Sequence, residues 1–340
     1  MTKERTMFTE AIGELLPKTL SRIATRGTTP FLPLPWDSIN NVMWGFKQGK
    51  ITTISARPSQ GKSTFMLQCA DYLAKLGRNV MYVSIEDDRV TISERLLSQR
   101  YKINNEILQR GRFQDVKHNY KKELEELAQE EQFYIVDSFG YNIPELERIH
   151  TKTKFRNGKH ADVIFYDYIQ MIDNAGLEAL EKFMNHIKEW ALKHDVAVVI
   201  GCQQNRQAAG SVTLEGMKGA GKLEEVSDAV ILLSYPYKTL SEGIGKFKEG
   251  DNKSSYDALC GERKDMVWKS YFEVDVAKNK DGATRLKIPL EFHGPYYYFR
   301  DWTGPNQIVE VHELGWKEFT VDDIMNGKRL RLGPNPLEKE

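Results

Sequence analysis

A Gly-Lys-Ser-Thr run between an apolar strand and an amphipathic helix is the feature that most constrains this sequence. Residues 51–55 form a short β-branched run, and residues 64–76 place apolar side chains on one helical face. In a P-loop, backbone N–H groups converge on phosphates at a helix N-terminus, the lysine adds charge, and a Ser or Thr hydroxyl reaches Mg²⁺. The sequence therefore predicts a triphosphate site whose nucleotide-binding residues are Arg57, Pro58, Ser59, Gln60, Gly61, Lys62, Ser63 and Thr64.

The chain after residue 36 alternates apolar strands with helices. Continuously apolar runs, which are typical of strands buried on both faces, occur at 80–85, 133–136, 163–166, 196–200 and 229–233. Three further strands, at 272–276, 286–290 and 296–299, follow one another with no helix between them. The expected fold is α/β, a twisted and mostly parallel sheet with helices on both faces and an antiparallel edge near the C-terminus.

Overall charge and cysteine content exclude several classes of protein. The 340 residues carry 48 basic and 48 acidic side chains, so any nucleic-acid surface must be a local patch. Cys69, Cys202 and Cys260 are far apart and form no zinc-type pair, and their odd number argues against a disulfide framework. No signal-peptide or membrane-length apolar run occurs, so we expect a cytoplasmic protein with no membrane partner.

A P-loop needs an acidic partner that helps to hold Mg²⁺ at the end of a neighbouring apolar strand. Asp167 follows the strand at 163–166 and is the preferred candidate over Asp137, which follows the strand at 133–136. Ser63 would be the second protein ligand of the metal.

Hydrolysis also needs a carboxylate that orients or deprotonates water. Glu86 follows the strand at 80–85, which commonly lies close to the P-loop strand, and it is the candidate for this role. The alternative for Glu86, as for Asp87 and Asp88, is a solvated charge at the start of the next helix. Gln203 closes the strand at 196–200, where a polar side chain faces the ligand crevice unless it belongs to an ordinary loop.

The two ends of the chain and one internal segment differ from the α/β pattern. Residues 1–26 predict an amphipathic helical segment that must dock on another surface, and a proline-rich stretch follows it. The α/β domain is expected over residues 27–320, with a mobile insertion at 237–270 that is rich in Gly, Lys and Ser. Residues 321–340 are expected to be a poorly ordered tail.

Six segments, in this order, resemble the RecA-like ATPase domain of the DnaB-like replicative helicases. The likeness covers residues 28–300, and its P-loop includes the alanine at position 56. The segments are 56–64, 84–86, 167–170, 202–206, 221–228 and 277–282.

The resemblance implies a ring, usually of six subunits, with ATP at each interface and single-stranded DNA in the central channel. It implies that Lys62 and Glu86 are catalytic, that Gln203 senses the γ-phosphate, and that Lys278 and Lys280 enter the neighbouring subunit's ATP site. The segment 1–26 would be the linker helix that packs on the next subunit. The N-terminal domain that contacts primase in bacterial members is expected to be absent, although primase and a helicase loader remain expected partners.

The resemblance also places a DNA-binding loop at Lys218, Gly219, Ala220, Gly221 and Lys222. Short side chains and free N–H groups let such a loop approach phosphates closely, and the absence of aromatic residues predicts sequence-independent binding. A surface loop without DNA is the alternative. Lys280 stands where the family commonly has arginine, so it supplies charge without a planar bidentate fork.

The expected function is that of an ATP-dependent, ring-forming DNA helicase or single-strand translocase. Two other functions remain open from sequence. One is a RecA-like recombination or annealing ATPase that binds DNA as a filament without unwinding it. The other is a regulatory ATP-binding module that needs no DNA.

Overall fold

The structure is a computed structural model, and it describes the chain in several separate ranges. The described residues are 31–112, 130–137, 143–167, 176–204, 220–241, 270–284 and 286–303, with the short pieces 12, 16–17, 20–21, 125, 213–214, 217, 308–309 and 319–320. Most of the segment 1–26, residues 242–269 of the expected insertion and the tail 321–340 lie outside them. The predictions made for those three segments therefore stay predictions.

Nine strands among the described residues form one mixed sheet in the order β11-β10-β9-β8-β3-β7-β6-β4-β5. The pairs from β8 to β5 are parallel, and β9, β10 and β11 are antiparallel, which confirms the expected fold class. The strands are β3 (Ile51–Ala56), β4 (Val80–Ser84), β5 (Phe133–Asp137), β6 (Val163–Asp167), β7 (Ala197–Gln203), β8 (Ala229–Ser234), β9 (Tyr271–Asn279), β10 (Leu286–His293) and β11 (Tyr298–Asp301).

Helices connect these strands in the way that parallel pairing requires. They are α2 (Asp37–Met43), α3 (Lys62–Lys75), α4 (Arg89–Tyr101), α5 (Asn105–Gln109), α7 (Ile143–Lys152), α8 (Gly176–His194), α9 (Ala220–Val226) and α10 (Pro236–Ser241), with a 3-10 turn η4 (Gly294–Tyr296). Short antiparallel pairs join β1 (Phe31–Leu32) to β2 (Phe46–Lys47) and β12 (Ile308–Val309) to β13 (Phe319–Thr320). None of the helices in the described ranges is both long and apolar enough to cross a membrane.

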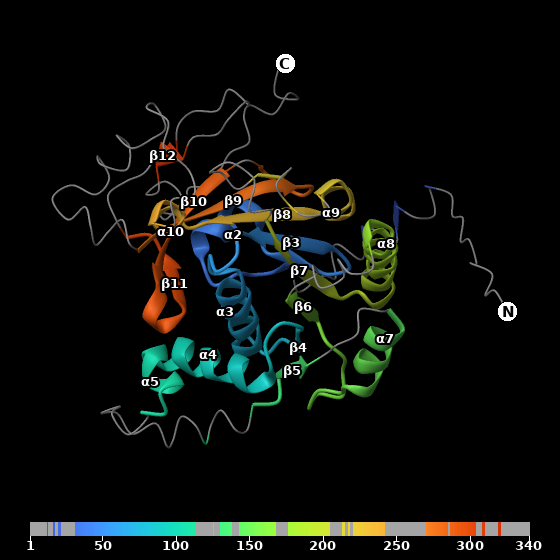
Figure 1. The fold of residues 1–340 in the computed structure, drawn as a ribbon. Helices are drawn as coiled ribbons and strands as arrows, with labels where there is room; N and C mark the ends of the chain where they lie inside the picture. The colour runs from blue at the N-terminus through green and yellow to red at the C-terminus, as the bar shows by residue number, and fades with distance from the viewer. Residues whose placement is uncertain are drawn as a thin grey trace, which may run out of the picture.

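The helices cover both faces of the sheet, as the continuously apolar strands predict (Figure 1). Side chains alternate along each strand, so that Val163 and Phe165 pack on the α3 side while Ile164 and Tyr166 pack on the α8 side. Helices α2, α3 and α4 contribute to the first cluster, and α7, α8 and α9 contribute to the second.

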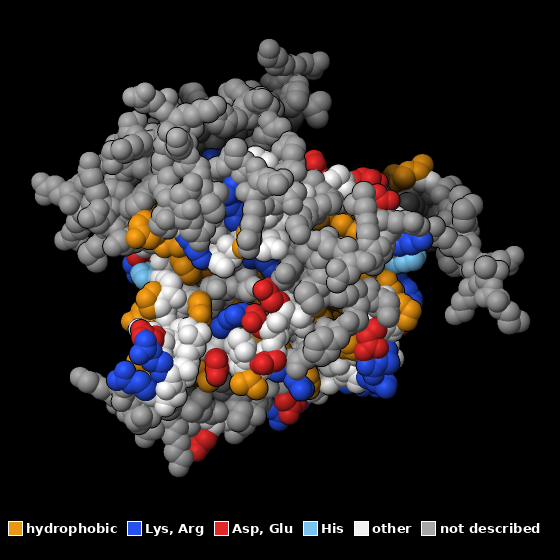
Figure 2. Space-filling model, in the orientation of Figure 1, with side chains coloured by type: hydrophobic (Ala, Val, Ile, Leu, Met, Phe, Trp, Pro, Cys, Tyr) orange, Lys and Arg blue, Asp and Glu red, His pale blue; other side chains and the backbone are white. Residues whose placement is uncertain are grey.

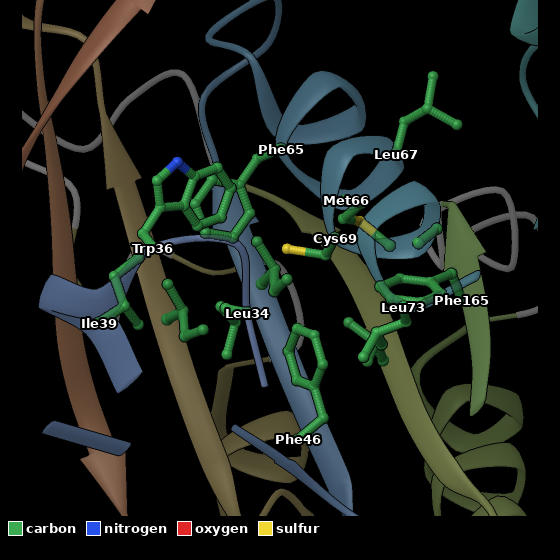
Figure 3. Close-up of a cluster of buried hydrophobic side chains, with 14 of the residues drawn as sticks. Leu34, Trp36, Ile39, Phe46, Phe65, Met66, Leu67, Cys69, Leu73 and Phe165 are labelled. Carbon is green, nitrogen blue, oxygen red and sulfur yellow. The ribbon is translucent and has the colours of Figure 1, made fainter. Parts of the chain in front are cut away.

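The cluster on the α3 side holds the P-loop helix against the sheet (Figure 3). Trp36 stacks on Phe65 with ring centroids 4.4 Å apart, and both are buried. The antiparallel edge also contacts this helix, because the Gln68 side chain donates to the carbonyl of Phe299 at 2.7 Å and accepts from its N–H at 2.8 Å. The start of α3 is therefore fixed by packing from segments on both sides of it in sequence.

The first residues of the expected insertion are helical. Residues up to Ser241 belong to α10, although their composition predicted a mobile segment from residue 237. Lys238 donates to the P-loop carbonyl of Ser59 at 2.7 Å, and this contact orders the start of the segment.

Candidate nucleotide site

The P-loop connects β3 to α3 through two residues with left-handed backbone conformations. Ser59 has φ 57° and Gly61 has φ 84°, and a methyl group on Gly61 would stand 3.1 Å from the Phe299 ring. Glycine is required at position 61 because the conformation and the close approach both exclude a side chain. Within the predicted loop, Arg57, Gln60 and Thr64 are buried, Pro58, Gly61, Lys62 and Ser63 are partly exposed, and Ser59 is exposed.

Lys62, in the first turn of α3, forms an ion pair with Oδ1 of Asp167 at the end of β6. Burial alone would raise the pKa of the Asp167 carboxyl. The Lys62 charge and the hydrogen bonds from Lys62, Ser63 and Tyr82 outweigh that effect, so the pKa lies below its ordinary value. Asp167 is thus an ionised, buried carboxylate beside the P-loop, as a metal ligand must be.

Tyr82 of β4 donates to Oδ2 of Asp167 at 2.8 Å. Burial, the Asp167 charge and this hydrogen bond raise the pKa of the phenol well above 10.0, so it stays a donor. Sequence reasoning missed this residue, although a tyrosine in an otherwise apolar, buried strand needs a partner for its hydroxyl.

Gly201 of β7 lies on the other side of the same ion pair. A methyl group at this position would stand 3.0 Å from Met66 Sδ, 3.1 Å from Asp167 Oδ1 and 3.2 Å from Lys62 Nζ. Lys62 and Asp167 meet directly in front of this strand because Gly201 has no side chain. An isolated glycine inside a strand is the sequence signal that could have identified it.

Glu86 emerges after β4, which is separated from β3 by β7 and β6 rather than lying next to it. The residue nevertheless lies near the site. Burial, Asp167 and Asp87 raise the pKa of Glu86, while the charge of Lys62 lowers it, and the net pKa is above 4.5. In the region where Figure 1 draws α3 and β6, acidic and basic side chains lie side by side on the surface (Figure 2).

The two acidic neighbours of Glu86 have structural partners. Asp87 forms an ion pair with Arg95 of α4, and its backbone carbonyl accepts from the Ser84 hydroxyl at 2.6 Å. Asp88 caps α4 by accepting from the N–H of Thr91 at 2.8 Å. The helix-start interpretation therefore fits Asp88, whereas Glu86 is close enough to Lys62 for the lysine charge to act on its pKa.

Gln203 and Asp137 differ in how close their strands lie to the P-loop. Gln203 is paired in register with Ala56, the residue at which the P-loop begins. Asp137 ends β5, an edge strand two places further from β3 than β6 is. This placement favours Asp167 over Asp137 as the metal ligand.

Gln204 was not predicted. Its N–H donates to Ala56 at 2.8 Å, and its side chain donates to the Ser55 hydroxyl at 3.2 Å and to the carbonyl of Thr213 at 2.9 Å. These hydrogen bonds connect the end of β7 to β3, the strand before the P-loop.

Lys278 and Lys280 lie toward the opposite end of the strands from the P-loop. Ala229, at the start of β8, pairs with both Thr52 of β3 and Asn279 of β9. The two lysines therefore sit beside the beginning of β3, whereas the P-loop follows its end. By this register Lys278 is level with Thr53 and Lys280 with Ile51. These positions lie three and five residues before the end of β3, or roughly 10 and 16 Å from it.

The predicted DNA-binding loop is only partly described. Lys218 and Gly219 lie outside the described residues, and Ala220 is described only as the start of α9. Gly221 is exposed, and Lys222 forms an ion pair with Glu225 at 3.3 Å.

The residues of the site have the chemistry needed to bind Mg²⁺ and a nucleoside triphosphate. One carboxylate and one hydroxyl, from Asp167 and Ser63, provide the few hard oxygen ligands that Mg²⁺ takes beside phosphates. No cluster of three or more His, Cys, Asp or Glu side chains that could hold a metal alone occurs within the described ranges.

A mostly parallel sheet with a P-loop at the end of β3 and an acidic residue at the end of β6 defines a RecA-like P-loop nucleotide-binding domain. The chain belongs to the family of the DnaB-like helicase C terminal domain, whose model matches residues 32–301. Nucleotide use follows from membership of this family.

Known proteins with similar sequences include a replicative DNA helicase DnaB of Helicobacter pylori, 25% identical over 305 residues. That match covers 83% of this chain and 62% of the relative, so the chain spans less than two thirds of its length. The DNA helicase/primase of Enterobacteria phage T3 is 26% identical over 217 residues, which cover 57% of this chain and 37% of that protein.

The solved structure of a DnaB-like replicative helicase, described together with its interactions with primase, has the same fold. It superposes with a TM-score of 0.67 at 22% sequence identity, and the match covers 87% of this chain and 68% of that chain. A solved structure of an isolated ATPase domain superposes with a TM-score of 0.68 at 21% identity, and the match covers 87% of this chain and 100% of that chain.

Proposed function

We propose that this chain is the ATP-hydrolysing motor of a replicative DNA helicase, which couples ATP turnover at subunit interfaces to movement along single-stranded DNA. Membership of the DnaB-like family and the geometry of the P-loop support the proposal. A ring of subunits, usually six, a cytoplasmic location, and primase and a loader as partners belong to the same proposal.

Each residue of the nucleotide site has a role in this reaction. When bound, Mg²⁺ would neutralise phosphate charge. Lys62 would hold the phosphates by its charge, and Asp167 and Ser63 would hold the ion. Tyr82 orients the Asp167 carboxylate by donating a hydrogen bond to its Oδ2, as partners of metal ligands commonly do.

Glu86 is the proposed general base. Its raised pKa makes the ionised carboxylate a stronger proton acceptor. The proposed role of Gln203, which is paired in register with Ala56, is to contact the γ-phosphate.

The placement of Lys278 and Lys280 is the observation that carries the proposal. They lie toward the end of the strands opposite to their own P-loop and therefore cannot complete their own site. These two ends of adjacent copies would face each other in a head-to-tail assembly, which closes into a ring when the rotation allows it. Lys280 would then add positive charge to the neighbour's transferring phosphoryl group.

A mixing experiment tests the shared site. Chains with Lys62→Ala lack a working P-loop but still supply Lys280. Chains with Lys280→Gln keep the P-loop but lack the lysine. Each variant alone should hydrolyse ATP poorly, and a mixture should regain activity at interfaces that combine the two intact halves. Mixing Lys62→Ala with Glu86→Gln is the matched control, because both changes lie in the same half and no recovery is expected.

The DNA-dependent part of the proposal has its own measurement. Wild-type protein should hydrolyse ATP faster with single-stranded DNA and should separate a forked duplex. An ATPase rate that is the same with and without single-stranded DNA, together with no strand separation, would overturn the helicase assignment. A mixture as inactive as its parents would overturn the shared site.

A further inference from the structure

The end of β9, with Lys278, and the turn after it, with Lys280, are bonded to the segment in which α9 ends. Lys278 Nζ donates to the carbonyl of Glu224 in the last turn of α9. The backbone N–H of Lys280 donates to the carbonyl of Asp228 at 3.0 Å, and Lys280 Nζ lies 3.1 Å from Asp228 Oδ1. Carbonyls at a helix end lack intrahelical partners, so the lysine donor fixes this end of α9.

Asp228 itself is anchored to the P-loop strand. Its N–H donates to the carbonyl of Ile51 at 2.8 Å, and its Oδ2 accepts from the N–H of Ile51 at 3.2 Å. The side chain is 9% exposed. The hydroxyls of Ser227 and Thr53, 2.7 Å apart, add a second link to β3. The Asp228 carboxylate is therefore a fixed point, which cannot follow Lys280 outward.

Several lysines surround this carboxylate. Lys50 Nζ lies 3.8 Å from Asp228 Oδ1, on the side of β3, and burial together with the charge of Lys280 lowers the pKa of Lys278. Glu224 and Asp228 are the acidic groups that offset this positive charge. The Lys280 side chain is 44% exposed, so its ion pair is of the kind that exchanges readily with another anion.

We propose that Asp228 is a positioning residue that restrains Lys280 on its own subunit, and that a shift of α9 on DNA binding releases Lys280 to the neighbour's nucleotide. The inference rests on the function proposed above, because it requires Lys280 to act in trans. Helix α9 begins within the predicted DNA-binding loop and ends two residues before Asp228. The Asp228 carboxylate thus joins Lys280 to the P-loop strand, while Lys278, two residues before Lys280, bonds to the end of α9.

Asp228→Asn removes the charge while keeping the shape of the side chain. Lys280 would lose its partner and be repelled by Lys50 and Lys278. The ATPase rate without DNA should rise about two- to fivefold, as the loss of a partly exposed ion pair allows. The ratio of DNA-stimulated to basal rate should fall by the same factor. Asp228→Glu, which restores the charge, should bring the ratio back toward the wild-type value.

A double variant separates restraint from a general structural effect. In the Lys280→Gln background, Asp228→Asn should no longer raise the basal rate, because the residue it restrains is gone. Glu145→Gln, which removes a carboxylate from an exposed ion pair with Arg148, is the matched control and should change neither rate.

Lys50→Glu provides a second test at a side chain that is 39% exposed. The added carboxylate gives Lys280 another partner on its own subunit, so the basal rate should fall and the DNA-stimulation ratio should rise. Thermal melting and particle mass of each variant show that assembly is intact.

Two outcomes would overturn the restraint. In the first, Asp228→Asn lowers the ATPase rate without DNA, as Lys280→Gln does. In the second, neither Asp228→Asn nor Lys50→Glu changes that rate. If Lys280→Gln itself leaves ATP hydrolysis unaltered in the wild-type background, the proposed shared site fails, and the restraint fails with it.

Discussion

Gly201 lies directly beside Lys62, and a methyl group on its Cα would stand 3.2 Å from the lysine Nζ. Gly201→Ala should therefore push Lys62 and Asp167 apart by a few tenths of an ångström. We expect kcat/KM for ATP to fall about tenfold, because small displacements at a reacting centre are costly. Steady-state ATPase measurements check this. Gly294→Ala, where a new methyl would meet only Phe292 at 3.6 Å, should leave the rate unchanged.

Tyr82→Phe removes one hydrogen bond from the Asp167 carboxylate without changing the packing of the ring. The Mg²⁺ concentration that gives half-maximal ATPase activity should rise about tenfold, the effect typical of losing a partner of a metal ligand. A magnesium titration at saturating ATP measures it. Tyr134→Phe, a partly buried tyrosine of β5 that packs on Phe155, is the control. Equal magnesium curves for wild type and Tyr82→Phe would show that the hydrogen bond does not support the metal site.

Glu86→Gln should lower the hydrolysis rate at least about 100-fold, the contribution of a general base, while nucleotide affinity stays near that of the wild type. A base acts only when ionised, so the wild-type rate should fall as pH drops through the pKa of Glu86. Because this pKa is raised, the midpoint of the acid limb should lie above 4.5. A pH–rate profile and a fluorescent-nucleotide titration test the two parts.

The neighbouring carboxylate provides the control for that experiment. Asp88→Asn alters the cap of α4 only slightly, because Asn and Asp are similarly good N-cap residues. It should leave the pH profile in place. A profile that moved with Asp88→Asn and not with Glu86→Gln would remove Glu86 from the chemistry.

A cluster of histidines between α7 and α8 predicts acid sensitivity of the fold. His150 is buried, and its ring lies 4.7 Å from that of His160, 5.0 Å from that of His194 and 5.0 Å from that of Trp190. Burial, His160 and His194 outweigh the opposing charge of Glu147 and lower the pKa of His150 to about 4.

The sign of the effect follows from linkage. The unfolded chain binds a proton at this histidine below pH 6.5, and the folded protein binds it only near pH 4. Stability is therefore full above pH 6.5 and falls as the pH drops toward 4, by at most about 3 kcal/mol. Denaturant unfolding at pH 7 and pH 5 should show a smaller loss for His150→Gln than for the wild type. Equal losses would contradict the assignment.

The sequence predicted which segments are strands better than it predicted which strands lie side by side. The apolar runs are strands because β-branched and aromatic residues fill a sheet covered on both faces, and β3, β6 and β8 start where they were expected. The order of the strands depends on crossovers that no local pattern encodes. For this reason the adjacency of β4 and β6, which brings Tyr82 to Asp167, could not be predicted.

In the nucleotide site, too, residues within a local motif were predicted and residues that act through distant contacts were not. Lys62 and Ser63 belong to a motif in which local spacing fixes the chemistry. Gly201 and Gln204 act through contacts with residues more than a hundred positions away along the chain. Composition misled the interpretation of residue 238, because a lysine in a polar stretch gives no sign that a P-loop carbonyl lies within its reach.

The contact between Gln68 and Phe299 has a consequence for how the protein is made. The two residues are 231 positions apart, and at ordinary rates of translation the ribosome needs roughly 10–50 s to cover such an interval. During that time the side-chain amide of α3 has no β11 backbone to bond, and the ring of Phe299 has not yet covered Gly61. The nucleotide pocket, encoded early in the chain, is therefore among the last parts of the domain to assemble.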